Sequence, residues 1–149
     1  NLIQDWRVRT ERNTTEDEFN VLVTNLLNLS GIDPQGFKKT VISCVVPPMM
    51  TILDAFCRKY LGHAPLWVDA RHCAAMPILY DNPDEVGADR IVNAVAAFDK
   101  FRSGTIVVDF GTSTNLDVVS AKGEFLGGAL ALVVLVRLGA AVAMRRFAA

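Results

Sequence analysis

Two short polar segments carry the residue types needed for chemistry on a phosphate or a hydroxyl group. The first, Asp109-Phe110-Gly111-Thr112-Ser113-Thr114, places a carboxylate at the end of an apolar run, followed by a glycine and three hydroxyl side chains. Such a turn can donate several hydrogen bonds to an anion, because glycine lets the backbone approach closely. Asp109 would either repel a phosphate or hold a cation, and the second role suits a nucleotide site. An ordinary β-turn has the same composition, and the segment is not a Walker loop because no Gly-Lys-Ser/Thr follows.

The second segment is Gly87-Ala88-Asp89-Arg90, which follows a proline-containing turn at Asp81-Asn82-Pro83. Gly87 frees the backbone just ahead of a predicted helix, and Asp89 in the first helical turn is stabilised by the helix dipole. Arg90 could bind a carboxylate-bearing substrate while Asp89 accepts a hydroxyl proton. A helix-starting aspartate beside a surface arginine fits the same residues, and local spacing does not decide between the two.

Composition limits the classes of protein that these segments can serve. The chain has 149 residues, of which 51% are hydrophobic, and a formal net charge of -1. That apolar content excludes a disordered tail and predicts one globular domain. The balanced charge argues against nucleic acid as a partner, since no large positive field is available. Cys44, Cys57 and Cys73 form no C-x-x-C pair and are expected as reduced thiols in a cytoplasmic protein.

Short apolar runs alternate with segments of helical period, and this alternation predicts an α/β fold. A capping box at 15–18 begins one helix, which ends at Gly31, and Pro47-Pro48 begins another, which ends at Gly62. A third helix starts near Asp89. We expect strands over 2–8, 41–46, 66–68 and 105–108, with a hairpin formed by 115–120 and 124–126. The runs at 41–46 and 105–108 are apolar enough to be covered on both faces, and 70–85 is predicted to be a long binding connection.

Two further features concern the later part of the chain. The pattern of predicted elements changes from βα units to a β-turn-β unit near Ser103-Gly104, which predicts a domain boundary there. The stretch from Leu126 to Met144 is apolar except for Arg137 and resembles a short membrane span. An arginine near its middle disfavours insertion into a bilayer, so a buried or interface helix is the preferred interpretation.

Taken in order, several motifs resemble those of the type III pantothenate kinases. The likeness runs from about Asp5 to Ala129, and its motifs keep both the order and the intervals of that family. The matching segments are 6–10, 43–48, 80–83, 86–91, 108–112 and 123–129.

The resemblance implies a fold and an activity. The family belongs to the superfamily of acetate and sugar kinases, heat-shock 70 proteins and actin, with two ribonuclease H-like α/β domains and an active site between them. Residues 1–103 would be most of the first domain and 104–149 the start of a truncated second one. The implied reaction is the phosphorylation of pantothenate by ATP to 4'-phosphopantothenate, the first step of coenzyme A synthesis.

The resemblance also implies roles for particular residues. Asp89 matches the catalytic base, and pantothenate would be bound by Tyr80 together with the segment Gly87, Ala88, Asp89 and Arg90. Asp109 matches a ligand of a monovalent cation, K+ or NH4+, while Gly111 and Thr112 match the ATP-binding phosphate loop. Mg2+ would arrive with ATP. The family implies a cytoplasmic homodimer whose interface includes apolar helices, with no membrane or nucleic-acid partner.

The sequence departs from the family pattern at three places. The family's first phosphate loop, Asp-x-Gly-Asn-Thr, has no counterpart ahead of Asn1, so a chain starting there should bind ATP poorly. The second loop ends in Asn115 where the family usually has threonine, and residues 130–134 replace a Pro-Gly turn. A partial record of a longer kinase is the preferred interpretation, and a truncated inactive product is the other. A non-catalytic regulatory or accessory protein is the alternative function, although the retained Asp89 favours the enzyme.

Overall fold

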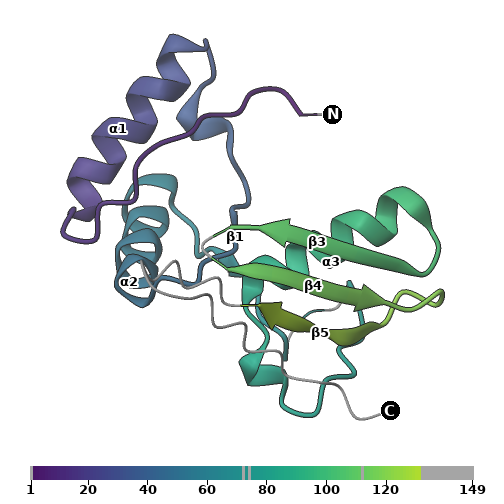
Figure 1. Ribbon diagram of the computed structural model, residues 1–149. Helices are drawn as coiled ribbons and strands as arrows, with labels where there is room; N and C mark the ends of the chain where they lie inside the picture. Colours follow the sequence, from purple (N-terminus) through teal and green to yellow (C-terminus); the bar gives the residue numbers. More distant parts are fainter. Residues whose placement is uncertain (1, 72, 74, 112, 132–149) are drawn as a thin grey trace. The chain divides into compact units, whose positions relative to one another are not determined.

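The computed structural model describes residues 2–71, 73, 75–111 and 113–131. The chain divides into two compact units, Asn1–Trp67 and Val68–Ala149, and each is described by itself. Both units combine helices with short strands, which confirms the predicted α/β class (Figure 1). The ribonuclease H-like fold and the domain boundary near Ser103-Gly104 stay predictions.

The first unit begins its regular structure with helix α1, Glu16–Leu29, and the predicted capping box is present. The backbone N–H of Glu18 donates to Thr15 Oγ1 at 3.2 Å, and the N–H of Thr15 donates to Glu18 Oε2 at 2.8 Å. This reciprocal pair satisfies two amides that have no partner inside the helix. The chain leaves the helix through Gly31 at a φ of 68°, as the sequence predicts.

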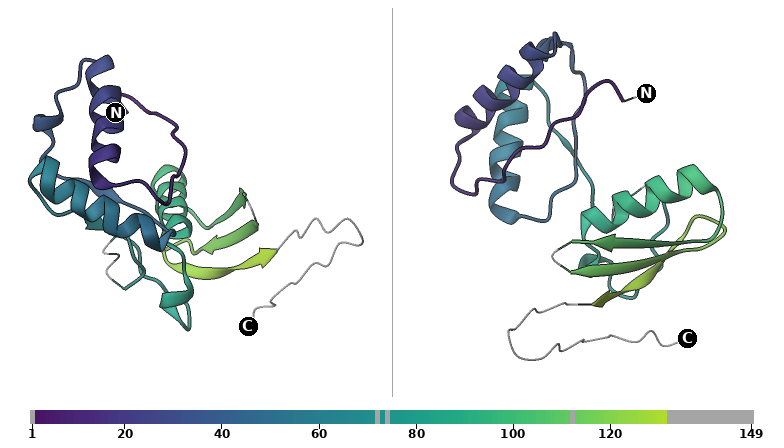
Figure 2. Two further views of the ribbon diagram at one scale, coloured as in Figure 1. Left: turned by 90° about the vertical axis from the view of Figure 1, so that its left-hand side faces the viewer. Right: turned by 45° about the horizontal axis from the view of Figure 1, so that its top comes forward.

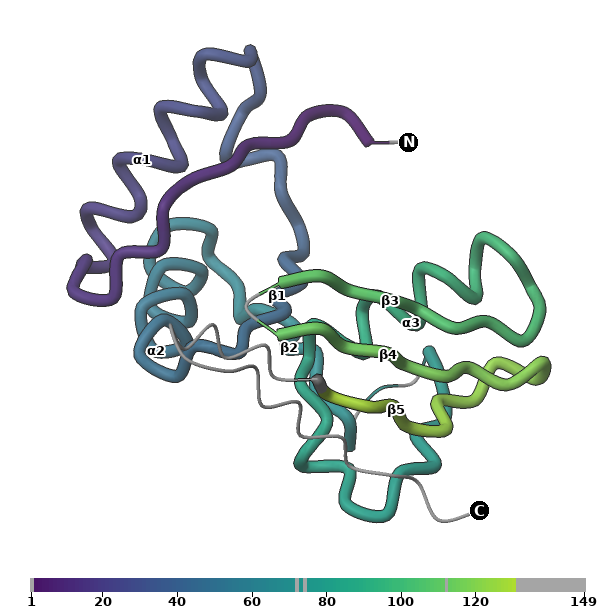
Figure 3. The backbone as a smooth tube through the Cα atoms, viewed as in Figure 1, coloured from purple at the N-terminus to yellow at the C-terminus, as the bar shows by residue number. Residues whose placement is uncertain are grey.

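Helix α2, Pro47–Phe56, starts with the predicted proline pair and continues as a π-helical turn, Cys57–Leu61. Gly62 ends it at a φ of 72°. Strands β1, Val41–Ile42, and β2, Leu66–Trp67, lie side by side in parallel (Figure 3). The core of this unit is small and centres on Ile42, Phe56 and Cys57. Burial raises the pKa of the Cys57 thiol, and within the described residues Cys44, Cys57 and Cys73 form no disulfide with one another.

Two strand predictions for this unit are wrong. Residues 2–8 form no strand, and β1 spans two residues instead of six. Val41 is 63% exposed, so the run at 41–46 is not covered on both faces. The physical reason is that a strand is held by a hydrogen-bonded neighbour, and among the described residues only β2 pairs with β1 while none pairs with 2–8.

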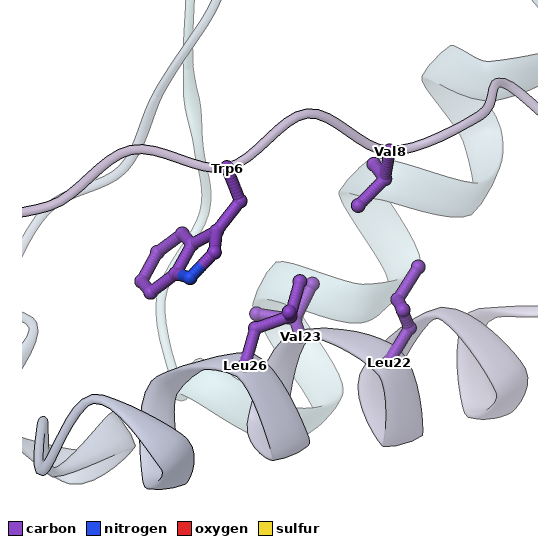
Figure 4. A pocket seen from close by; sticks show the side chains of 5 residues that line it. All are labelled: Trp6, Val8, Leu22, Val23 and Leu26. Carbon is purple, nitrogen blue, oxygen red and sulfur yellow. The ribbon is translucent and has the colours of Figure 1, made fainter.

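The N-terminal segment packs against α1 instead. Trp6 and Val8 direct their side chains from the extended segment toward the helix, where they meet Leu22, Val23 and Leu26 around a small apolar hollow (Figure 4). The apolar side chains of this segment, which has no pairing strand among the described residues, therefore pack against one face of α1. Leu2 and Ile3, at the start of the segment, remain exposed.

The second unit is a helix on a sheet. A 3₁₀ turn, Pro83–Glu85, precedes helix α3, Ala88–Phe101, which is followed by strands β3, Thr105–Phe110, β4, Thr114–Val119, and β5, Phe125–Ala131. The strands are antiparallel with β4 in the middle, and α3 lies along one face of the sheet (Figure 2). The predicted hairpin is confirmed. Ile91, Ala94, Val119 and Phe125 form the buried core together with Met76 from the long connection and Val86 just after it.

Residues along β3 and β4 alternate between the covered and the exposed face. Ile106 is 64% exposed, whereas Asn115, Asp117 and Val119 are buried. The prediction that 105–108 is covered on both faces is therefore wrong. An antiparallel hairpin needs no crossover helix, so one helix covers one face and leaves the other open.

The membrane interpretation of Leu126 to Met144 finds no support in the described residues. Leu126 to Ala131 belong to strand β5, so the preferred prediction of a buried or interface helix is wrong over these residues. Residues 132–144, including Arg137, lie outside the described part of the chain. Within that part, no helix combines the length and apolar character needed to cross a bilayer.

The capping box gives a first prediction. Thr15→Ala removes the side chain that receives the Glu18 amide, so it should lower the free energy of unfolding by about 1 kcal/mol, measured by urea titration followed by circular dichroism. Thr10→Ala removes the same atoms from the exposed segment ahead of the helix and serves as the control. Equal stability of the two variants would show that the box does not hold the helix end.

Candidate functional site

The first turn of α3 carries Asp89 on an exposed surface. Gly87 is the residue before the helix, with an extended backbone, and its carbonyl accepts the Arg90 and Ile91 amides at 3.1 and 3.3 Å. Ala88 is buried against the unit. Asp89 Oδ1 accepts a hydrogen bond from the backbone N–H of Arg90 at 2.9 Å. The negative charge of the carboxylate is stabilised by the positive end of the helix dipole. The predicted base therefore lies open to solvent on an anchored turn.

Arg90 turns inward to the sheet, where it meets a residue that sequence reasoning missed. Its Nε donates to Asp117 Oδ1 at 2.9 Å, and its Nη2 donates to the same oxygen. The Asp117 side chain is 1% exposed and that of Arg90 15% exposed, so the ion pair is mostly shielded from water. The guanidinium carbon also lies 5.6 Å from the centre of the Phe125 ring, within cation–π range.

The sheet makes room for this ion pair at Gly128, which lies opposite Asp117 on β5. A Cβ atom at this position would lie 2.7 Å from Arg90 Nη2 and closer still to Asp117 Oδ1 and the Leu116 carbonyl oxygen. A bulge between Val118 and Val119, with Gly127 at a φ of 117°, sets the register that brings Gly128 here.

Asp109 lies near the end of β3 on the same face of the sheet as Asp117. Asn93 of α3 donates to Asp109 Oδ2 at 3.3 Å, and Asn115 of β4 is the cross-strand partner of Asp109. Asn115 Oδ1 is buried and has no hydrogen-bond partner among the described residues. A buried amide oxygen without a donor, next to a carboxylate, suits a hard cation. The described residues contain no cluster of three His, Cys, Asp or Glu side chains suited to a metal ion.

Tyr80 and Gly111 lie on other parts of the same unit. The segment before Tyr80 pairs with the start of β5, since the Leu79 amide donates to the Phe125 carbonyl at 2.8 Å, and Tyr80 packs partly buried against the core. Gly111 is exposed in the turn after β3. In the described part of the chain no hydrogen bond joins Tyr80 or Gly111 to Asp89. Thr112 lies outside the described residues.

The long connection ahead of α3 is closed by an exposed ion pair. Arg71 donates from Nε and Nη2 to the two carboxylate oxygens of Asp84. Arg71 lowers the pKa of the Asp84 carboxyl, and this bidentate pairing joins the two ends of the connection. The sequence gives no local signal for this pair, because the two partners are thirteen positions apart along the chain.

Comparison with known proteins decides the family. The family model for type III pantothenate kinase matches residues 1–139. The chain belongs to this family.

Among curated relatives, the type III pantothenate kinase of Desulfatibacillum aliphaticivorans is 59% identical over 129 residues, which cover 87% of the chain and 50% of that protein. The type III pantothenate kinases of Desulforapulum autotrophicum and Desulfosudis oleivorans are 57% and 54% identical over 130 residues, which cover 87% of the chain and 50% and 51% of those proteins. The chain therefore spans about half the length of the curated relatives it matches.

Gly128 gives a second prediction. Gly128→Ala should lower the free energy of unfolding by about 1–3 kcal/mol, because the added methyl group displaces the ion pair or the strand. Gly104→Ala is the matched control, since its Cβ would meet its nearest atom, the Ala121 nitrogen, at 3.5 Å. Chemical denaturation compares the two, and a Gly128→Ala variant as stable as Gly104→Ala would contradict the packing described.

Proposed function

We propose that the protein carrying this chain transfers the γ-phosphoryl group of ATP to the primary hydroxyl of pantothenate, giving 4'-phosphopantothenate for coenzyme A synthesis. The observation that carries the proposal is the match to relatives named type III pantothenate kinase over 87% of the chain. An exposed carboxylate on an anchored helix turn supports it, because phosphoryl transfer depends on positioning and on charge neutralisation more than on covalent chemistry by the protein.

Asp89 is proposed as the general base. Its carboxylate is exposed, so a substrate hydroxyl can reach it, and the Arg90 amide orients one of its oxygens. The hydroxyl proton passes to Asp89 as the substrate oxygen bonds to the γ-phosphorus, and the bond from that phosphorus to the bridging oxygen breaks so that ADP leaves. Gly87, Ala88, Arg90 and Tyr80 are proposed to form the pantothenate site around it.

Two sets of residues are proposed to serve ATP and cations. Gly111 and Thr112, which follow β3 in the sequence, would contact ATP, and Mg2+ would be bound by the nucleotide. A monovalent cation, K+ or NH4+, would be held by the Asp109 carboxylate and by Asn115 Oδ1, which has no hydrogen-bond partner among the described residues; oxygen ligands suit such an ion. When bound, the cation offsets negative charge near the phosphates.

The cellular setting belongs to the same proposal. We propose that the protein works in the cytoplasm as a homodimer, with apolar helices in the interface. A non-catalytic regulatory protein derived from the same fold remains an outcome of the assay below.

The base assignment gives a third prediction. In protein expressed with the residues that flank this sequence in its gene, Asp89→Asn should lower the kcat of pantothenate-dependent ADP production by about 10²- to 10⁴-fold. Asp99→Asn, at the exposed far end of the same helix, is the control and should leave kcat near the unsubstituted value. Unchanged turnover in Asp89→Asn would remove Asp89 from the mechanism.

The same assay separates the enzyme from the regulator. No turnover by the unsubstituted protein, together with partner capture that needs no nucleotide, would favour the regulatory function.

A further inference from the structure

The Arg90–Asp117 ion pair is placed where it can control the geometry around Asp89. One residue joins the two: the backbone N–H of Arg90 donates to Asp89 Oδ1, and its side chain donates twice to Asp117 Oδ1 on the central strand. The predicted base is thus one residue away from an anchor fixed in the sheet.

Stability alone does not explain this arrangement. Burying two charges removes their hydration, and well-packed apolar residues of similar volume often serve stability equally well or better. The sheet nevertheless has a glycine, Gly128, at the position where a side chain would collide with the pair, and the Phe125 ring lies against the guanidinium. What such a pair supplies is direction, because two N–H groups of a planar fork converge on one fixed oxygen.

We propose that Asp117 and Gly128 are positioning residues for the pantothenate site. They act through Arg90, whose anchored side chain fixes the first turn of α3 and with it the carboxylate of Asp89. This inference rests on the proposed function, since it assumes that Asp89 and Arg90 serve pantothenate. Neither Asp117 nor Gly128 needs to touch the substrate.

The proposal predicts an effect confined to one substrate. Asp117→Asn keeps the shape of the side chain but removes its charge, so the guanidinium loses its compensating partner and its fixed direction. In protein expressed with its flanking residues, kcat/KM for pantothenate should fall about 10- to 100-fold, because small displacements of catalytic groups have effects of this size. The KM for ATP should change by less than about twofold, because the anchor holds α3 and not the turn after β3.

Two control variants separate positioning from loss of stability. Ile91→Val trims a buried side chain in the same helical turn without touching a charge, and Asp84→Asn removes the carboxylate of the exposed Arg71 pair. Both should keep kcat/KM for pantothenate within about twofold of the unsubstituted protein. Thermal melting of all variants shows which of them share a loss of stability. When Asp117→Asn is compared with a control variant of equal melting temperature, its kcat/KM for pantothenate should fall further.

Three results would overturn the proposal. One is an Asp117→Asn variant that loses no more efficiency than Ile91→Val. Another is an equal loss for ATP and pantothenate, which marks a purely structural role. If Asp117→Asn does not fold, Arg90→Lys takes its place, since lysine keeps the charge but loses the fork. Unchanged pantothenate efficiency in folded Arg90→Lys is the third.

Failure of the proposed function is recognised separately. If the unsubstituted protein does not phosphorylate pantothenate, the function proposal fails, and positioning is then read from hydrogen exchange of the 88–91 amides. Asp117→Asn should speed their exchange at least about tenfold relative to Asp84→Asn, because the first helical turn loses its anchor. Equal exchange in the two variants would refute the anchoring itself.

Discussion

The buried ion pair between Arg90 of α3 and Asp117 of β4 is the interaction on which the second unit depends. It joins the start of the helix to the central strand of the sheet, and its partners are almost fully removed from water. Leaving one of two buried charges without its partner costs about 3–5 kcal/mol, a large part of the stability of a domain this size. Three features accommodate the pair: Gly128 leaves the space, the bulge between Val118 and Val119 sets the register, and the Phe125 ring lies against the guanidinium.

The same constraint shapes the chemistry proposed for this family member. A carboxylate on a helix end can act as a base only if the helix end keeps its place during the reaction. Asp89 is exposed, so its position depends on its neighbours. The Arg90 backbone N–H donates to the Asp89 carboxylate, and the Arg90 side chain is paired with Asp117. Asp109 and Asn115 lie on the same face of the sheet, so one helix covers both the proposed cation site and the anchor of the base.

How much of this could be predicted from the sequence depends on whether the signal is local. The capping box at Thr15 and Glu18, the start of α2 at its prolines and the hairpin after β3 are determined by neighbouring residues, and all are confirmed. The prediction of a strand over 2–8 is wrong, because a strand forms only where a second strand from elsewhere in the chain pairs with it. The prediction that 105–108 is covered on both faces fails for the same reason, because an apolar run does not show which other elements pack against it.

The site shows the same division. Asp89 and Arg90 stand out in the sequence because they open a helix, but the direction of the Arg90 side chain depends on a strand 27 positions later. A signal for Asp117 exists in the alternation of β4, which puts this charged residue in line with buried Val119. Its partner is evident only once the helix has been placed on the sheet.

The anchor is tested most directly by a double-mutant cycle on unfolding, with Arg90→Gln, Asp117→Asn and the double variant compared in urea titrations. An anchoring pair predicts that each single change is strongly destabilising and that the double change loses less than their sum, with a coupling free energy of about 0.5–3 kcal/mol. Strictly additive losses would contradict it, because the two charges would then contribute independently and Asp117 would hold nothing through Arg90.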